Sequence, residues 1–236
     1  TVKMEARDIK PKLLHLTDRY GDGTFSFSAE ADIEHPASAN ELQAWLNISA
    51  FKLAGDAAEE APFSGKKLTL QAQPSDKGHH LTLRSDFADL EYEGTLKVKS
   101  LKELGFQALA HTLPDDSAKT LMPQAEGKSV AFVLAVKDTE ILRRLAGINI
   151  WQEGTIQAHG NIGVGGKDFA LSLIAPKISI GKMTLEQATL FAQNNGEGFD
   201  LLGKCGKRSA KSRLTTEVRM KRDEDGRILT DVEWME

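Results

Sequence analysis

Residues 81–94, with the sequence LTLRSDFADLEYEG, contain two short runs in which apolar and polar side chains alternate. Leu81 and Leu83 occupy odd positions, whereas Leu90 and Tyr92 occupy even ones. Alternation with a period of two is typical of a β-strand with one apolar and one polar face. A slip of one residue would move a strand to the wrong face, so we expect a bulge or bend near residues 85–87. The stretch therefore predicts a strand, a corner and a second strand.

The same alternation continues along most of the chain. It recurs in residues 25–33, 68–72, 96–98, 130–136, 156–164, 169–173, 178–180, 188–192, 214–220 and 228–234. Turn signals such as Asp22-Gly23 and Asn195-Gly196 separate these runs closely enough for antiparallel hairpins. Further corners are expected near residues 50–51 and 173–174, where the apolar positions again change parity. These patterns predict an all-β fold built on a long, curled, mostly antiparallel sheet.

Only two stretches favour a helix. Ser100 and Glu103 form a capping box, and Pro114 marks the end of the first helix. Asp138 is placed to cap a second, shorter helix that ends at Gly147. Residues 34–43 and 56–65 are interpreted as loops, and so is the basic segment 204–211.

The composition excludes several classes of protein. The chain has 236 residues, 27% of them charged, and a net charge of -4, which does not favour a disordered tail or a nucleic-acid binder. It lacks a run of about 20 apolar residues of the kind that a membrane-spanning helix requires. Its single cysteine, Cys205, cannot form an internal disulfide. Neither a start methionine nor a signal peptide is visible, so we interpret the chain as a fragment of a longer protein.

Candidate chemical motifs all have simpler explanations. His79 and His80 are adjacent and would face opposite sides of a strand, so they cannot chelate one ion together. Residues 163–166 are rich in glycine but lack the strand–loop–helix setting of a phosphate loop. Cys205 has no obvious histidine or acidic partner for nucleophilic catalysis. We therefore expect no catalytic, metal or cofactor site, and a protein that binds or carries rather than an enzyme.

The apolar face of the predicted strands is the remaining candidate site. Its side chains are mainly Leu, Ile, Val and Ala, which suit either the packed core of a closed sandwich or an open apolar trough. Periodicity does not separate these alternatives. If the trough exists, its expected lining is Leu68, Leu70, Leu81, Leu83, Leu90, Leu96, Val130, Phe132, Leu134, Ile156, Ile162, Val164, Leu171, Leu173, Ile178 and Ile180.

Two blocks of the sequence are similar to a known family. Residues 81–94 resemble the L-x-L-x-S-D-x-A-D-x-x-x-x-G stretch of TamB/AsmA-like proteins, particularly the Bacteroidota type. Residues 154–190 are similar to that family's recurrent unit, in which a strand with G-x-I precedes an apolar strand ending in Ala-Pro and a glycine turn. The similarity covers about residues 65–235. The basic segment around Cys205 has no counterpart in the family.

The resemblance implies a fold, a location and a function. TamB-like proteins are anchored in the inner membrane by an N-terminal helix, cross the periplasm, and curl their sheet into an open trough called a β-taco. The resemblance implies a TamB-like groove segment at residues 65–236, preceded at 1–64 by further strands and loops of the same sheet. The implied role is movement of phospholipid between the inner and outer membranes, with other acyl-chain lipids, a TamA-type barrel protein and adjoining segments of the same chain as further partners.

Two other functions stay open. The first is a scaffold that offers strand edges to outer-membrane β-barrel proteins during their assembly and secretion. The second is a ligand-binding β-sandwich, which would require converging carboxylates or stacked aromatic rings. Trp45, Trp151 and Trp234 are too scattered in the sequence to suggest such a pocket.

Overall fold

Nearly all of the described chain is β-strand. The computed structural model describes residues 1–10, 13, 23–34, 43–54, 63–65, 67–94, 129–140, 143, 150–164, 168–181, 183–195, 198–208, 213–222 and 227–235. In chain order the strands are β1 (Val2–Ile9), β2 (Thr24–Glu34), β3 (Gln43–Ala54), β4 (Phe63–Gly65), β5 (Leu68–Ser75), β6 (Gly78–Ser85), β7 (Ala88–Gly94), β8 (Val130–Val136), β9 (Ile150–Glu153), β10 (Ile156–Ile162), β11 (Asp168–Ile180), β12 (Met183–Asn195), β13 (Phe199–Arg208), β14 (Arg213–Arg222) and β15 (Ile228–Met235).

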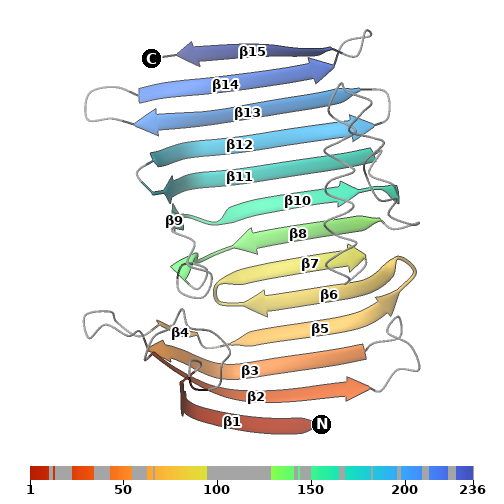
Figure 1. Ribbon diagram of the computed structural model, residues 1–236, viewed down its shortest axis with the longest axis vertical. Helices are drawn as coiled ribbons and strands as arrows, with labels where there is room; N and C mark the ends of the chain where they lie inside the picture. The colour runs from red at the N-terminus through yellow and green to blue at the C-terminus, as the bar shows by residue number, and fades with distance from the viewer. Residues whose placement is uncertain are drawn as a thin grey trace.

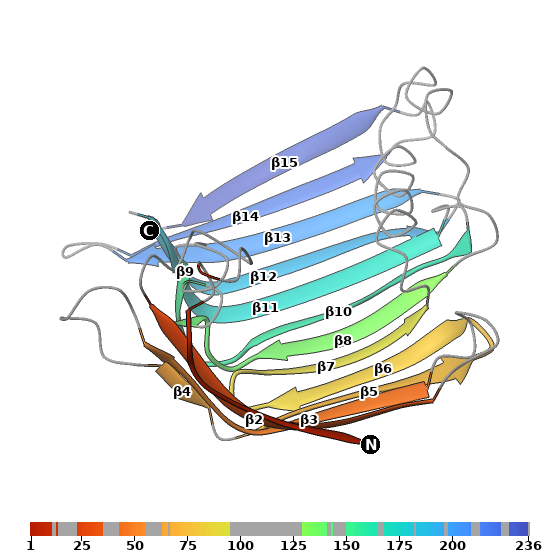
Figure 2. The same cartoon turned by 60° about the horizontal axis from the view of Figure 1, so that its bottom comes forward.

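The strands form one 15-stranded antiparallel sheet. Its order follows the chain from β1 to β15, except that β4 pairs only with β3 and β9 pairs only with β11. The sheet curls (Figure 1 and Figure 2), but the edge strands β1 and β15 do not pair with each other, so it is not closed into a barrel. The predicted all-β class and curled antiparallel sheet are confirmed. A two-layer sandwich does not describe this arrangement, because all the described strands belong to a single sheet.

The predicted corners have three different structures. Near residues 85–87 the chain makes a hairpin turn between β6 and β7, and Arg84 pairs directly with Asp89. The Ser85 hydroxyl closes this turn, since it donates to the Ala88 carbonyl at 2.7 Å and accepts from the Ala88 N–H at 2.9 Å. The turn itself absorbs the parity change, and the described β6–β7 ladder contains no bulge.

The other two corners involve the ladders. Between β2 and β3 the register shifts at Ser28, leaving Ser49 as the extra residue of a bulge, which is next to the predicted corner. At Leu173 and Ile174 the β10–β11 and β11–β12 registers both continue unbroken. There, instead, β11 changes its partner, from β10 to β9, as it passes Pro176.

Two predicted loops contain strands. Residues 63–65 form β4, although the sequence predicts a loop over 56–65. The sequence also predicts a loop over the basic segment 204–211, but β13 continues to Arg208 and includes Cys205. The strand forms there because backbone pairing with β14 supplies hydrogen bonds that the side-chain pattern does not indicate.

The two helix predictions have different outcomes. The expected helix from Ser100 to Pro114 lies outside the described residues. At the second, Asp138 caps a helical turn as expected, because its Oδ1 accepts the Glu140 N–H at 2.8 Å, and the Arg143 N–H donates to the Thr139 carbonyl at 2.9 Å. No helix in the described ranges is long and apolar enough to cross a membrane.

Candidate apolar binding face

One register row of the sheet is apolar across its whole width. In this row Leu70 pairs with Leu83, Leu83 with Leu90, and Leu90 with Leu134. Followed from β1 to β15, the row is Val2, Ala31, Leu46, Leu70, Leu83, Leu90, Leu134, Ala158, Leu173, Leu190, Gly203, Val218 and Val232. It contains no charged or hydrogen-bonding side chain. Directly paired residues project from the same face of a sheet, so the row is a continuous strip that crosses the strands.

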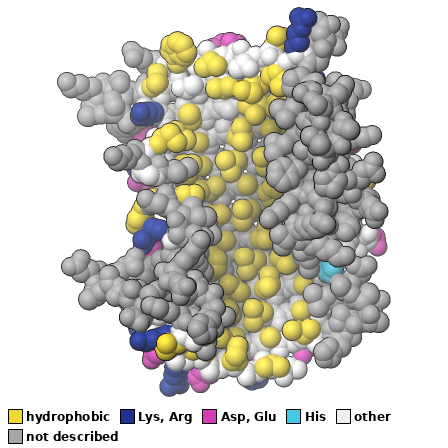
Figure 3. Space-filling model, viewed as in Figure 1, with side chains coloured by type: hydrophobic (Ala, Val, Ile, Leu, Met, Phe, Trp, Pro, Cys, Tyr) yellow, Lys and Arg dark blue, Asp and Glu magenta, His cyan; other side chains and the backbone are white. Residues whose placement is uncertain are grey.

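A second apolar row lies beside the first on the same face. In this row Tyr92 pairs with Phe132, Phe132 with Gly160, and Gly160 with Leu171. A Cβ atom built on Gly160 would lie 3.0 Å from the Phe132 ring, so this ring covers the gap that the glycine leaves. Hydrophobic side chains accordingly run along the face shown in Figure 3, from one end of the sheet to the other. We call the two rows together the apolar strip.

The leucines of the apolar strip are half-buried, whereas Val2 and Val232 on the two edge strands are exposed. Leu70, Leu83, Leu90, Leu134 and Leu173 all have intermediate exposure. The fully buried members of the two rows are small: Ala72, Ala158 and Ala192. Within the described residues a second sheet does not pack on this face, since every strand belongs to the same sheet. The strip therefore combines buried alanine side chains with leucine side chains that are still partly exposed and can contact a ligand.

The expected lining residues divide into three groups. One group shares the apolar face by its register, either in the strip or in the rows that flank it: Leu68, Leu70, Leu81, Leu83, Leu90, Val130, Phe132, Leu134, Ile156, Ile162, Leu171 and Leu173. Val164 lies beyond the end of β10 and is 58% exposed, and Ile178 pairs with β9 beyond Pro176, so neither belongs to the strip. Leu96 and the side chain of Ile180 lie outside what the structure describes.

The structure adds residues that the sequence-based list did not contain. Tyr92, Ala158, Leu190 and Val218 belong to the strip through their register. All four lie in runs that already show the alternating pattern. Leu201 on β13 also joins the second row, opposite Ala192. Its signal is weak, because Leu202 follows it and the alternation is lost.

The opposite face is not uniformly polar. Val133, Phe191 and Leu202 project from it with exposed fractions of 57%, 40% and 42%. A shallow hollow of about 400 Å³ lies there over β8, β10 and β11, with Val133 and Phe191 in its lining. The cause is visible in β8, where every residue from Val130 to Val136 is apolar, a pattern typical of strands with two apolar faces.

The polar candidates from the sequence do not converge. His79 is buried and its neighbour His80 is exposed, as expected for adjacent residues of a strand. Within the described part of the chain, His, Cys, Asp and Glu side chains form no cluster of three or more suited to a metal ion. Cys205 is a partly buried free thiol, and Lys204 beside it lies 3.8 Å from the Glu217 carboxylate. The basic segment is therefore partly neutralised by the neighbouring strand.

Comparison with known proteins does not assign the chain to a family. No protein-family model, curated protein or solved structure matches it. What the fold and its site define is a class by geometry: an open, curled antiparallel sheet with an uninterrupted apolar strip on one face.

Proposed function

We propose that this chain is a segment of a lipid-conducting protein of the bacterial cell envelope, similar to TamB/AsmA-like proteins, in which acyl chains lie against the apolar strip. The observation that carries the proposal is the register row from Val2 to Val232, which is apolar at each strand that it crosses. A sealed core would place a second layer over such a row. Here the large leucines of the row keep part of their surface exposed, in a sheet whose edges are not joined.

Hydrocarbon is the ligand that this surface favours. Burial of each CH₂ group contributes about 0.8 kcal/mol, so an acyl chain gains several kcal/mol from contact with the leucines. The row offers no hydrogen-bonding side chain that would hold a ligand at one place along its length. The affinity is therefore distributed along the strip, and a tail can slide without breaking a specific bond.

The dimensions of the strip suit movement. With about 4.8 Å between neighbouring strands, the path from β1 to β15 measures roughly 60 Å along the curved sheet. One leaflet of a bilayer has a hydrocarbon thickness of about 15 Å, half of the full core. The strip is several times longer than a lipid tail, so it is a track rather than a pocket for a single position.

The remaining parts of the proposal follow from the family resemblance. The carried ligand is a phospholipid or another acyl-chain lipid, and the setting is the periplasm, with the full-length protein anchored in the inner membrane. Adjoining segments of the same chain would continue the sheet, and a TamA-type barrel protein is the proposed outer-membrane partner. The non-enzymatic character of the chain is part of the same proposal.

A pair of neighbouring substitutions tests lipid binding. Leu134→Asp places a carboxylate in the middle of the apolar strip, whereas Val133→Asp places the same group one residue away on the opposite face. The purified variants would be incubated with phospholipid vesicles and re-isolated, and the lipid they carry measured by extraction and native mass spectrometry. We expect Leu134→Asp to lose the lipid that lies across β8, about a quarter of the total on a strip roughly four tail lengths long, and Val133→Asp to retain it.

Two results would contradict the proposal. The first is wild-type protein that carries no lipid. The second is a Leu134→Asp variant that keeps all of its lipid while circular dichroism shows an intact sheet. If only Val133→Asp loses lipid, the hollow on the opposite face is the binding site instead.

Handling of outer-membrane β-barrel proteins is a second candidate, favoured by the edges of the sheet. In the described part of the chain, β1 pairs only with β2 and β15 only with β14. An unpaired strand edge presents backbone donors and acceptors to which an extended client strand can add. A photocrosslinker at Asp231 of β15 should then capture an unfolded barrel strand, whereas one at Thr82 in the middle of the sheet should not.

A further inference from the structure

A polar hollow lies on the face opposite the apolar strip. Its volume is about 640 Å³, and β5, β6, β7 and the C-terminal end of β8 contribute to it. Its cationic residues are Lys67, Arg84 and Lys137, and its carboxylates belong to Asp86 and Asp89. Every other lining side chain is a hydroxyl or an amide, including Thr69 and Gln71. The volume falls within the usual range for small-ligand sites, but every lining residue carries a polar or charged group.

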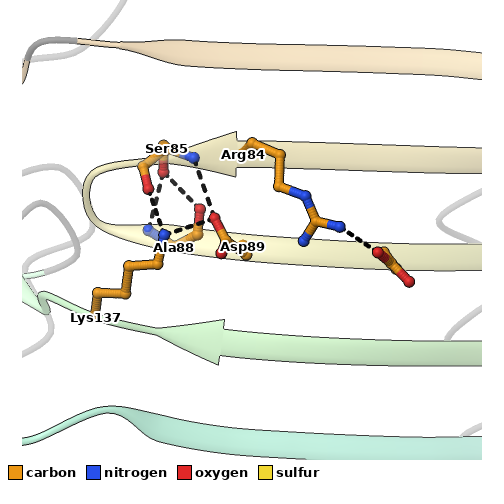
Figure 4. A network of polar contacts seen from close by, with 6 residues as sticks. Arg84, Ser85, Ala88, Asp89 and Lys137 are labelled. Atoms are coloured by element: carbon orange, nitrogen blue, oxygen red, sulfur yellow. Dashed lines mark hydrogen bonds and ion pairs between the residues drawn. The ribbon is translucent and has the colours of Figure 1, made fainter.

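Hydrogen bonds hold one side of this hollow in place. The Lys137 ammonium group donates to the Ser85 carbonyl at 2.9 Å and to Asp89 Oδ1 at 2.8 Å. The Ser85 N–H also donates to Asp89 Oδ1, at 3.4 Å, and Arg84 forms an ion pair with Glu91. Figure 4 shows these groups gathered around the turn between β6 and β7. This side of the hollow is therefore preorganised, since Arg84, Asp89 and Lys137 are already held by neighbours.

Lys67 differs from the other two cations of the hollow in the contacts of its side chain. Its backbone N–H donates to Asp86 Oδ2 at 3.3 Å, but its ammonium group has no partner among the described residues. The three cations and two carboxylates of the lining give it a formal charge of about +1, before the Glu91 partner of Arg84 is counted. An ammonium group in a polar hollow favours an anionic group such as a phosphate, which it binds through charge-assisted hydrogen bonds.

We propose that this hollow binds the phosphate ester of a polyol, with the phosphate on Lys67 and the hydroxyl groups on the carboxylates and amides around it. A polyol hydroxyl both donates and accepts, which matches a lining that contains Asp86 and Asp89 as acceptors and Gln71 as donor and acceptor. Such a ligand is either a soluble phosphorylated polyol or the headgroup of a glycerophospholipid. The site does not rest on lipid conduction, because it lies on the other face of the sheet.

Titration of the isotope-labelled chain with glycerol 3-phosphate tests the site. We expect millimolar binding, with amide shift changes at Ser85, Asp89 and Lys137. Lys67→Met should weaken it at least tenfold, as expected for loss of one charge-assisted hydrogen bond, and Lys67→Arg should retain it. Lys204→Met, an exposed lysine on β13, is the matched control and should bind like the wild type. Glycerol without phosphate should bind at least tenfold more weakly.

Vesicles then distinguish the two sources of ligand. Retention on phosphatidylglycerol vesicles but not on phosphatidylcholine vesicles, reversed by glycerol 3-phosphate and lost in Lys67→Met, identifies a membrane headgroup. Binding of glycerol 3-phosphate without such retention identifies a soluble ligand. The proposal is overturned if glycerol 3-phosphate causes no shifts at these residues, if glycerol binds equally well, or if Lys67→Met binds like the wild type. The Leu134→Asp variant should keep this site, so its failure and that of lipid conduction are separable.

Discussion

Leu90 and Leu134 lie directly opposite each other on β7 and β8, and both are half-buried on the apolar face. About 40 residues separate them in the sequence, yet they are adjacent members of the row that runs from Val2 to Val232. Their partial exposure is the property that separates an open strip from a packed core. This partial exposure can be tested by measuring how much a truncation of Leu134 lowers the free energy of unfolding.

Leu134→Ala should destabilise the protein only modestly. A fully buried Leu→Ala change costs about 2–5 kcal/mol, because it removes contacts and leaves a cavity. Leu134 already offers part of its side chain to solvent, so we expect a loss of about 1 kcal/mol in the free energy of unfolding, measured in urea. Val130→Ala, at a buried position of the same strand, should cost about 2 kcal/mol despite removing fewer atoms. A Leu134→Ala cost well above that of Val130→Ala would indicate a sealed core.

Substitution of Gly94 by alanine should destabilise the protein more than the same substitution of Gly203. Gly94 has a φ of +146°, and a Cβ atom there would lie 2.7 Å from the Ser129 carbonyl oxygen. Gly94→Ala should therefore destabilise by about 1–3 kcal/mol through backbone strain and collision. At Gly203 the nearest atom to a new Cβ is 3.8 Å away, so Gly203→Ala should change stability by less than about 0.5 kcal/mol. Equal midpoints in urea for the two variants would contradict this reading of the backbone.

Deletion of Ser49 should cost little stability. Ser49 is the extra residue of the β2–β3 bulge, so its removal leaves Ile48 opposite Ala29 and Ala50 opposite Ser28 in a regular ladder. Phe51, which is 5% exposed, then lies two positions after Ile48 and keeps its face. We expect the deletion to cost less than about 1 kcal/mol, and Ser49→Ala loses only a long 3.4 Å hydrogen bond to the Ser28 carbonyl. Thermal unfolding of both variants checks this, and a deletion variant that is destabilised much more than Ser49→Ala would show that the fold depends on the bulge.

The Asp89–Lys137 pair should contribute a pH-dependent part of the stability. Burial opposes ionisation of Asp89, but hydrogen bonds from Lys137 and from the Ser85 backbone, with the charge of Arg84, outweigh it and lower the pKa of Asp89. A carboxyl group whose pKa is lower in the folded state stabilises the protein above its unfolded pKa of about 3.9. This stabilisation is lost as the pH falls through the folded pKa.

Urea unfolding of Asp89→Asn between pH 7 and pH 3 measures this contribution. At pH 7 the variant should be less stable than the wild type by less than about 1 kcal/mol, because the pair is only partly shielded from water. The difference should shrink below about pH 4, as the wild-type carboxyl group becomes protonated. Asp76→Asn, in the turn between β5 and β6, serves as a control for the loss of a negative charge. A difference that grows on acidification would contradict the assigned sign.

Sequence alone was sufficient for the strands that alternate and for their apolar faces, whereas β1, β3, β4, β9 and β13 contain none of the runs that it identified. Alternation within a strand is a local property, because successive side chains point to opposite sides of any sheet, so Leu68, Leu81, Phe132 and Leu171 could be placed on one apolar face without coordinates. Where alternation fails, the prediction fails as well. The sequence predicts a loop at residues 204–208 of β13, because Lys204, Cys205 and Lys207 show no apolar period.

Only the tertiary structure decided which residues meet and what covers them. Backbone hydrogen bonds between strands set the register, which the pattern within one strand does not specify. This register pairs Leu90 with Leu134, Leu134 with Ala158, and Phe132 with Gly160. The same holds for exposure. An apolar face is identical in sequence whether another layer packs on it or not, and the single open sheet is what leaves the leucines of the strip half-buried.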